Sequence, residues 1–219
     1  MAYLAEHLKK SHADFIAAFI LLKVVIFSTF VDAIFMHLSA IKQLRVYIMA
    51  LIKSVRGFTP VFGKNCYLAE NATVIGDVVI GDDCSIWFNT VLRGDVNSIR
   101  IGNKVNIQDG AVLHTLYQKS TIEIGNNVSI GHNVTIHGAT LKNDVLIGIG
   151  ATVLDHAIIG ENSIIAANAL VLSNTIVEPN SVYAGVPAKK VKEIEPSQSK
   201  EMIEKIANNY LMYASWYQD

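Results

Sequence analysis

The sequence predicts an all-β solenoid, a parallel β-helix of hexapeptide repeats, from three observations. From Ile75 onward an aliphatic residue returns at about every sixth position. That residue is often followed by Gly and then by Asn or Asp, as in Ile80-Gly81-Asp82-Asp83 and Ile124-Gly125-Asn126-Asn127. A period of six fits neither the 3.6-residue period of a helix nor the alternation of a two-sided strand. The later period is unbroken through Ile147, Val153, Ile159, Ile165, Val171, Val177 and Tyr183.

Each hexad is expected to form one short strand and one turn. The aliphatic residue points into a narrow core, and Gly and Asn tolerate the left-handed backbone of the turn. Stacked coils bury the apolar surface that a single coil would leave exposed. The period is one residue short between Ile136 and Leu141, and it slips again between Leu113 and Ile124. The second slip contains Tyr117-Gln118-Lys119-Ser120, which indicates an excursion from the coil.

Three segments are predicted: residues 1–56, residues 57–192, which form the β-helix, and residues 193–219. The first segment is strongly apolar without a hexad period, so we expect a helical extension outside the core, a membrane-associated helix, or helices packed on the end of the β-helix. Lys23 and Asp32 interrupt its longest apolar run, so a clean membrane span of about 20 residues is not present. Membrane association is expected only through residues 1–56.

Residues 193–219 are predicted to form an amphipathic helix that covers the apolar side of the β-helix. Met202, Ile206, Tyr210 and Tyr213 follow at helical spacing and mark its apolar side, and the aromatic residues among them are expected to be core. Ser197 or Ser199 could cap the start of this helix.

Composition excludes some partners. The 219 residues carry a net charge of -1, and we find no basic stripe that would bind a phosphate backbone, so nucleic acid is not an expected partner. The two cysteines, Cys66 and Cys84, lack the close spacing of a zinc-binding or disulfide framework. Two cysteines without a disulfide framework are compatible with a reducing cytoplasm, which is the expected location of the protein.

Three histidines, His114, His132 and His137, lie within 24 positions of the repeat, where ordinary residues are small, apolar or turn-forming. Neutral imidazole suits zinc, and three protein ligands leave a fourth position for water, whose pKa zinc lowers to about 7. The sequence therefore predicts a metal site for Zn²⁺, although Fe²⁺ and Co²⁺ also accept imidazole. His114 and His132 are eighteen residues apart, one turn of three hexads, but the intervening excursion prevents assigning their faces by counting.

Four motifs surround these histidines. They are Val91-Leu92-Arg93-Gly94-Asp95-Val96, Asn106-Ile107-Gln108-Asp109-Gly110, Leu113-His114, and Gly131-His132-Asn133-Val134-Thr135-Ile136-His137-Gly138. With these motifs the chain resembles the gamma class of carbonic anhydrases and their close relatives, from about Gly57 to Lys192. The resemblance implies a left-handed β-helix that forms homotrimers, a metal between two subunits, and hydration of carbon dioxide to bicarbonate.

The resemblance also implies a role for each matching residue. His114 and His137 would come from one chain and His132 from its neighbour. Arg93 and Asp95 resemble the ion pair across the subunit interface, with Asp109 as an acidic partner near Arg93. Gln108 matches the position that hydrogen-bonds the metal-bound water, Asn106 lies on the same strand face, and Tyr183 would also reach the pocket.

Two alternatives remain open. The class carries an acidic loop that moves the proton away from the metal-bound water, whereas this chain has Val96-Asn97-Ser98 and Tyr117 there. Hydration could therefore be slow. One alternative is a metal-stabilised trimeric scaffold without activity. The other is an acyltransferase that binds acyl-coenzyme A between coils, because Tyr183-Ala184-Gly185-Val186-Pro187-Ala188-Lys189-Lys190 resembles the closing segment of those enzymes. One histidine acting as general base would suffice there, which leaves two of the three unexplained.

Overall fold

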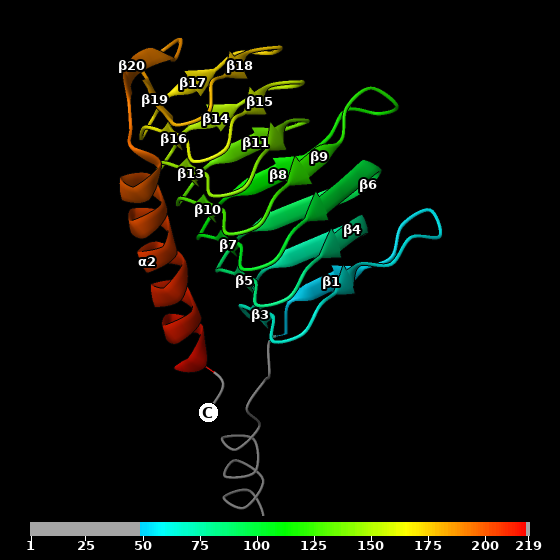
Figure 1. The fold of residues 1–219 in the computed structure, drawn as a ribbon. Helices are drawn as coiled ribbons and strands as arrows, with labels where there is room; N and C mark the ends of the chain where they lie inside the picture. Colours follow the sequence, from blue (N-terminus) through cyan, green and yellow to red (C-terminus); the bar gives the residue numbers. More distant parts are fainter. Residues whose placement is uncertain (1–48, 218–219) are drawn as a thin grey trace, which may run out of the picture. The chain divides into compact units, whose positions relative to one another are not determined.

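The computed structural model describes residues 49–217, in which the hexads form a parallel β-solenoid of about seven turns followed by one helix (Figure 1). The prediction of a β-helix is confirmed. The strands are β1 (Leu51–Lys53), β2 (Val61–Phe62), β3 (Tyr67–Leu68), β4 (Thr73–Ile80), β5 (Ser85–Ile86), β6 (Val91–Ile101), β7 (Asn106–Ile107), β8 (Val112–His114), β9 (Ile122–Ile124), β10 (Ser129–Ile130), β11 (Thr135–His137), β12 (Thr140–Leu141), β13 (Leu146–Ile147), β14 (Thr152–Val153), β15 (Ile158–Ile159), β16 (Ile164–Ile165), β17 (Leu170–Val171), β18 (Ile176–Val177), β19 (Ser181–Ala184) and β20 (Lys189–Glu193).

The strands form three faces. The first face is one sheet, in the order β3, β5, β7, β10, β13, β16 and β19, and β20 pairs antiparallel with β19 at its end. The second face continues from the first halves of β4 and β6 into β8, β11, β14 and β17. The third face continues from their second halves into β9, β12, β15 and β18. The eleven residues of β6 pair with both β8 and β9 because this strand runs round the corner between two faces.

The interior is a stack of aliphatic side chains that the parallel register aligns. On the first face Ile86, Ile107, Ile130 and Ile147 are successive partners, and none of them is exposed to solvent. Each such side chain contributes about 1.5–3 kcal/mol relative to an exposed one. The turns have left-handed backbone, as the repeat predicted; at one corner the residues with positive φ are Asn65, Asp83, Lys104, Asn127, Asp144, Asn162 and Asn180.

Coil length varies where the sequence period slips. A regular coil has 18 residues, as from Ile164 to its partner Val182. The coil from Asn106 to Ser129 has 23, because it contains the excursion, and the next one, from Ser129 to Leu146, has 17. Both predicted slips are confirmed.

The N-terminal boundary differs from the prediction. Leu51–Lys53 form β1, which pairs with β4, so the solenoid begins inside the segment that the sequence assigned to the extension. Residues 1–48, on which the prediction of a helical extension falls, lie outside the described residues. No helix of the described residues is long and apolar enough to cross a membrane.

The C-terminal helix, α2 (Pro196–Ser215), contacts β5 and β10 of the first face. Two details correct the prediction. Pro196 opens the helix and its N-cap is Glu195, which makes no side-chain cap, while Ser199 instead donates to the carbonyl of Pro196. Met202 is exposed; the most buried side of α2 carries Ser199, Ile203, Ala207 and Ala214.

Candidate metal centre

His114 and His137 lie side by side on the second face. The register pairs them directly across β8 and β11, and their ring centroids are 5.3 Å apart. Both imidazoles are only partly exposed. Because the intervening coil has 23 residues, the partner of His114 is His137, whereas a count of eighteen would have given His132.

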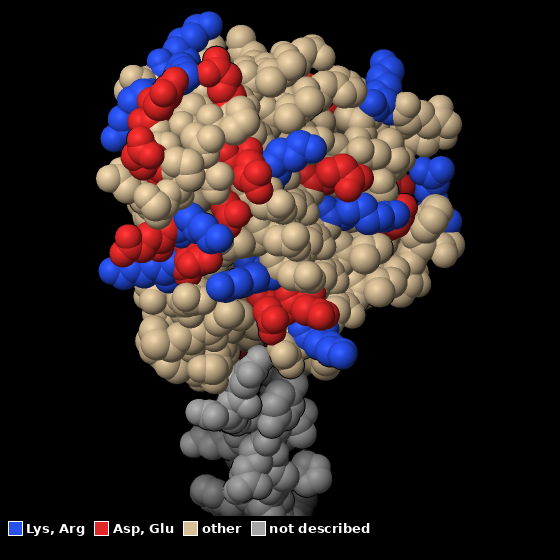
Figure 2. Space-filling view, in the orientation of Figure 1, with Lys and Arg blue, Asp and Glu red and all other residues tan. Residues whose placement is uncertain are grey.

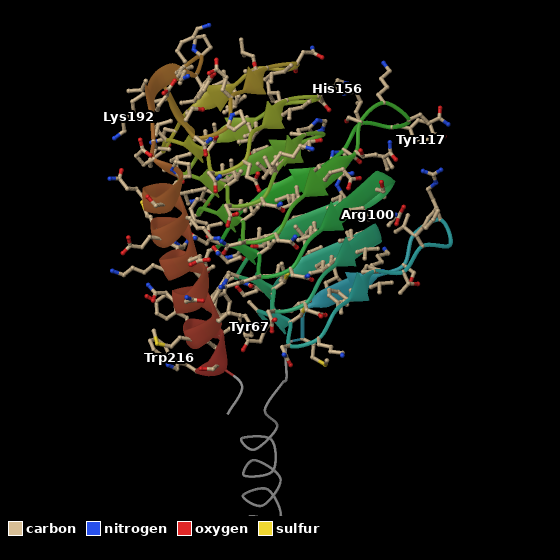
Figure 3. All side chains as sticks on the ribbon, viewed as in Figure 1. Tyr67, Arg100, Tyr117, His156, Lys192 and Trp216 are labelled. Carbon is tan, nitrogen blue, oxygen red and sulfur yellow. The ribbon has the colours of Figure 1, made fainter. Side chains whose placement is uncertain are left out.

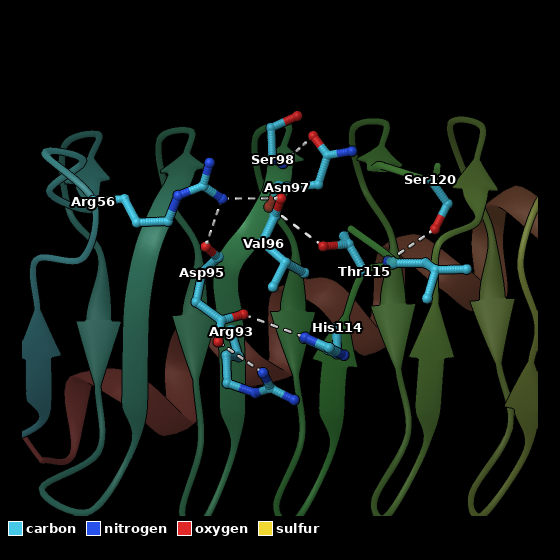
Figure 4. A network of polar contacts seen from close by, with 10 residues as sticks. Arg56, Arg93, Asp95, Val96, Asn97, Ser98, His114, Thr115 and Ser120 are labelled. Carbon is cyan, nitrogen blue, oxygen red and sulfur yellow. Dashed lines mark hydrogen bonds and ion pairs between the residues drawn. The ribbon is translucent and has the colours of Figure 1, made fainter. Parts of the chain in front are cut away.

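Two charged residues adjoin His114. Arg93 is its partner on β6, and Asp95 follows two residues later. The Asp95 carboxylate accepts from Arg93 at 2.8 Å and lies 3.3 Å from Nε2 of His114 (Figure 4). Arg93 and Asp95 therefore pair within one chain, and their pairing across an interface stays a prediction.

The environment keeps His114 neutral and Asp95 charged. Burial lowers the pKa of His114, and the nearby Arg93 guanidinium lowers it further, against the opposing effect of Asp95. Burial alone would raise the pKa of Asp95, but hydrogen bonding and charge from Arg93, and then His114, hold it below its usual range. A neutral imidazole is the form that binds a metal.

His137 has a carboxylate partner that was not predicted from the sequence. Its Nδ1 lies 2.9 Å from Oδ2 of Asp155, whose other oxygen accepts from Ser120 at 2.6 Å. Asp155 follows His137 by eighteen residues, one more than the 17-residue coil that joins β11 to β14, so counting along the register does not identify it. We call His114, His137, Arg93, Asp95 and Asp155 the two-histidine edge.

His132 lies elsewhere, in the turn between β10 and β11. Its Nδ1 lies 2.8 Å from Oδ2 of Asp109, its neighbour in the preceding coil, so Asp109 pairs with His132 and not with Arg93 in this chain. Beside Asp109, Gln108 donates to Asn106 at 3.0 Å, and Asn106 donates to Ser129 at 2.7 Å. We call His132, Asp109, Gln108 and Asn106 the one-histidine corner.

An aromatic cavity of about 310 Å³ opens at this corner. Asp109 lines it together with Trp87, which follows β5, and Tyr210 of α2. Trp216, the residue after α2, also lines it and is labelled in Figure 3. Trp87 stacks edge-on against Tyr210 at 5.3 Å. The tyrosines predicted as helix core therefore also line a cavity next to a candidate ligand.

The edge and the corner lie at opposite ends of the second face, because His132 precedes β11 and His137 ends it. In the described part of the chain, no group of three or more His, Cys, Asp or Glu side chains is placed to hold a metal ion. Tyr183, on β19, is buried in the hydrophobic core and is separated from the Gln108 strand by β10, β13 and β16. Within one chain the structure does not bring Tyr183 to either group.

Where the class carries acidic residues, this chain has Asn97 and Tyr117, and Arg56 reaches this place from the turn between Val55 and Phe58. Arg56 donates to the carbonyls of Asp95 and Val96, and its guanidinium lies 5.4 Å from the ring centre of Tyr117. Thr115 donates to the carbonyl of Asn97 and joins the two loops (Figure 4). A cavity of about 200 Å³ lies among them, and its lining combines the Arg56 guanidinium with the carboxylates of Asp77 and Asp95.

Charge on the visible surface follows the sequence prediction. In Figure 2 acidic and basic side chains are interspersed over the solenoid and the helix, with no basic stripe on that face. Pairs such as Arg100 with Asp77, at 2.8 Å, contribute to this mixture.

Comparison with known proteins agrees with the fold and the motifs. The family model described as bacterial transferase hexapeptide (six repeats) matches residues 59–94 and 138–173. A carbonic anhydrase of Geobacillus kaustophilus is 46% identical over 167 residues, 76% of this chain and 91% of the relative. A probable carbonic anhydrase of Methanocaldococcus jannaschii is 48% identical over 150 residues, 68% of this chain and 91% of the relative.

Among solved structures, a putative acetyltransferase of Bacillus cereus superposes with a TM-score of 0.72 at 37% sequence identity. The match covers 77% of this chain and 97% of the other. The two kinds of relative thus carry different activity names on one fold.

Proposed function

Because this chain belongs to the gamma-class carbonic anhydrase-like family of hexapeptide-repeat proteins, we propose that it hydrates carbon dioxide at zinc sites shared between the subunits of a homotrimer. One observation carries the proposal. Three imidazoles with carboxylate partners lie along the second face, two on its strands and one in the turn that leads into it. When the edge of one chain meets the corner of the next, three ligands converge.

The donor chemistry fits zinc. Three neutral imidazoles with an open fourth position form a known catalytic donor set, and ligating histidines usually donate their second nitrogen to a carboxylate or carbonyl. His132 and His137 hold their Nδ1 atoms against Asp109 and Asp155, which leaves Nε2 for a metal. At His114 the carboxylate faces Nε2, so binding there displaces Asp95 or uses Nδ1. A zinc ion in such a site supplies a water of lowered pKa as nucleophile.

The corner supplies the residues that orient the reactants. Asn106 is held by Ser129 and in turn accepts from the amide nitrogen of Gln108, so the amide oxygen of Gln108 is fixed as the free acceptor. That oxygen can accept a hydrogen bond from the attacking water and so orient it. The aromatic cavity beside Asp109 gives apolar surroundings to a neutral substrate such as carbon dioxide.

Two carboxylates, Asp77 and Asp95, line the cavity beside the edge, but each is paired with an arginine and is therefore a weak proton acceptor. Arg56, Asn97 and Tyr117 occupy the place where the class carries acidic residues, and a fixed guanidinium repels a departing proton. We therefore expect proton removal by buffer, and turnover that rises with buffer concentration.

An acyl-coenzyme A-dependent acyltransferase is the second candidate, supported by the likeness to a putative acetyltransferase. That activity needs one basic histidine and no metal. It uses one imidazole with its carboxylate and leaves the other two unexplained. Coenzyme A binding to the chelator-treated protein, measured by calorimetry, separates the two candidates.

Complementation between variants tests whether the site is shared. His132→Ala removes the corner ligand and His137→Ala removes an edge ligand, so neither variant alone should retain metal. In trimers mixed at random from equal amounts, each mixed trimer holds one complete site, and we expect about a quarter of wild-type metal and hydration. A mixture that gains nothing over the separate variants contradicts a shared site. Mixing two corner variants, His132→Ala and His132→Asn, is the matched control.

A further inference from the structure

The excursion from the solenoid ends at Ser120, and this residue lies beside a candidate metal ligand one coil away. Ser120 is 4% exposed although it belongs to a surface loop. Its hydroxyl accepts from the backbone of Leu116, which closes the loop, and donates to Asp155 at 2.6 Å. The second oxygen of Asp155 faces Nδ1 of His137 at 2.9 Å.

Gly138 makes room for this contact. It lies beside Asp155 in the next coil, with its carbonyl accepting from the backbone of His156, and its φ is +60°. A Cβ built on Gly138 would collide with both the Asp155 carboxylate and the Ser120 hydroxyl. The missing side chain is thus the space through which the two groups meet.

Each carboxylate oxygen has one partner. Oδ1 of Asp155 accepts from the Ser120 hydroxyl at 2.6 Å, which leaves Oδ2 as the acceptor that faces Nδ1 of His137. An acceptor at Nδ1 places the proton of a neutral imidazole there and leaves Nε2 bare. The geometry favours one tautomer of His137 before any metal arrives.

We propose that Asp155, held by Ser120 of the excursion loop, is a positioning residue that sets His137 in the Nδ1–H tautomer and presents Nε2 as a metal ligand. The value of this setting for metal binding rests on the proposed function, whereas the tautomer itself does not. The excursion, Leu116–Ser120, then has a defined role: it delivers Ser120 to the carboxylate.

Nitrogen NMR of the whole protein, labelled only at histidine and freed of metal, tests the tautomer. Solid-state spectra distinguish protonated from bare ring nitrogens, and His137→Asn identifies the signals. We expect wild-type His137 to be protonated at Nδ1, Asp155→Ala to shift the proton toward Nε2, Asp155→Asn to retain part of the wild-type pattern, and Ser120→Ala to cause a smaller shift. Unchanged His137 signals in Asp155→Ala overturn the proposal.

Cobalt binding by chelator competition is the second measurement. Loss of a carboxylate partner of a ligating histidine typically weakens metal binding by about 10–100-fold, and we expect this range for Asp155→Ala. Asp82→Ala is the matched control, because Asp82 also precedes a left-handed turn residue, Asp83, and accepts a backbone hydrogen bond away from the histidines. If wild-type protein binds no cobalt but Asp155→Ala still shifts the His137 tautomer, the metal proposal is refuted and the role of Asp155 is upheld.

Discussion

The two-histidine edge and the one-histidine corner differ in what they contribute. The edge holds two imidazoles on paired strands, with an arginine and two carboxylates around them. The corner holds one imidazole on a turn, with an amide relay and an aromatic cavity beside it. Under the proposed function, the edge would hold the cation and the corner would orient what reacts there. Neither group alone has three imidazoles, so the proposal requires subunits to assemble.

The largest expected effect comes from removing the corner imidazole. His132→Ala should leave two ligands per site, too few for an open zinc site, so bound metal falls to near zero and hydration falls by about 100-fold or more. Metal analysis and stopped-flow hydration measure both. His156→Asn, which replaces an exposed turn histidine by a residue suited to its positive φ, should change neither. Full metal occupancy in His132→Ala would remove the corner from the site.

A smaller effect is expected from the amide relay of the corner. Gln108→Ala should keep metal bound and lower kcat for hydration by about 10–100-fold, because its proposed partner is the reacting water. Gln118→Ala, an exposed glutamine of the excursion, is the control. Equal turnover in Gln108→Ala and wild type would mean that Gln108 has no part in the reaction and that His132 is the contribution of the corner.

The smallest effect concerns pH and the edge. The pKa of His114 is lowered in the folded chain. As pH falls below the ordinary histidine value of about 6.5, His114 is therefore protonated in the unfolded chain before it is protonated in the folded chain. Metal-free wild-type protein should therefore lose unfolding free energy between about pH 7 and pH 5, and His114→Asn should lose less. Urea unfolding at three pH values measures the difference. A steeper loss in His114→Asn would show that the sign is wrong.

Much of the fold followed from the sequence because one residue in six must enter a narrow core. The period of Ile147 to Tyr183 predicts stacked coils, and its slips locate the short coil and the excursion. The register of the histidines did not follow, since five extra residues between His114 and His137 could lie at several places in a coil. Only the paired strands show which two imidazoles are neighbours.

Side-chain partners were harder to predict than coils. Asp155 resembles any other turn carboxylate, and its contact with Ser120 depends on the missing side chain of Gly138. The most buried side of α2 was mispredicted because Ile203 and Ala207 pack where Met202 was expected. Spacing along a helix gives the stripe but not the residue at its centre.

Metal content of the purified protein, measured with carbon dioxide hydration before and after chelation, tests the central claim most directly. The account predicts about one metal ion per chain, hydration above the uncatalysed rate, loss of that rate on chelation, and recovery when zinc is returned. A protein that contains no metal, or that hydrates carbon dioxide equally well after chelation, would contradict it.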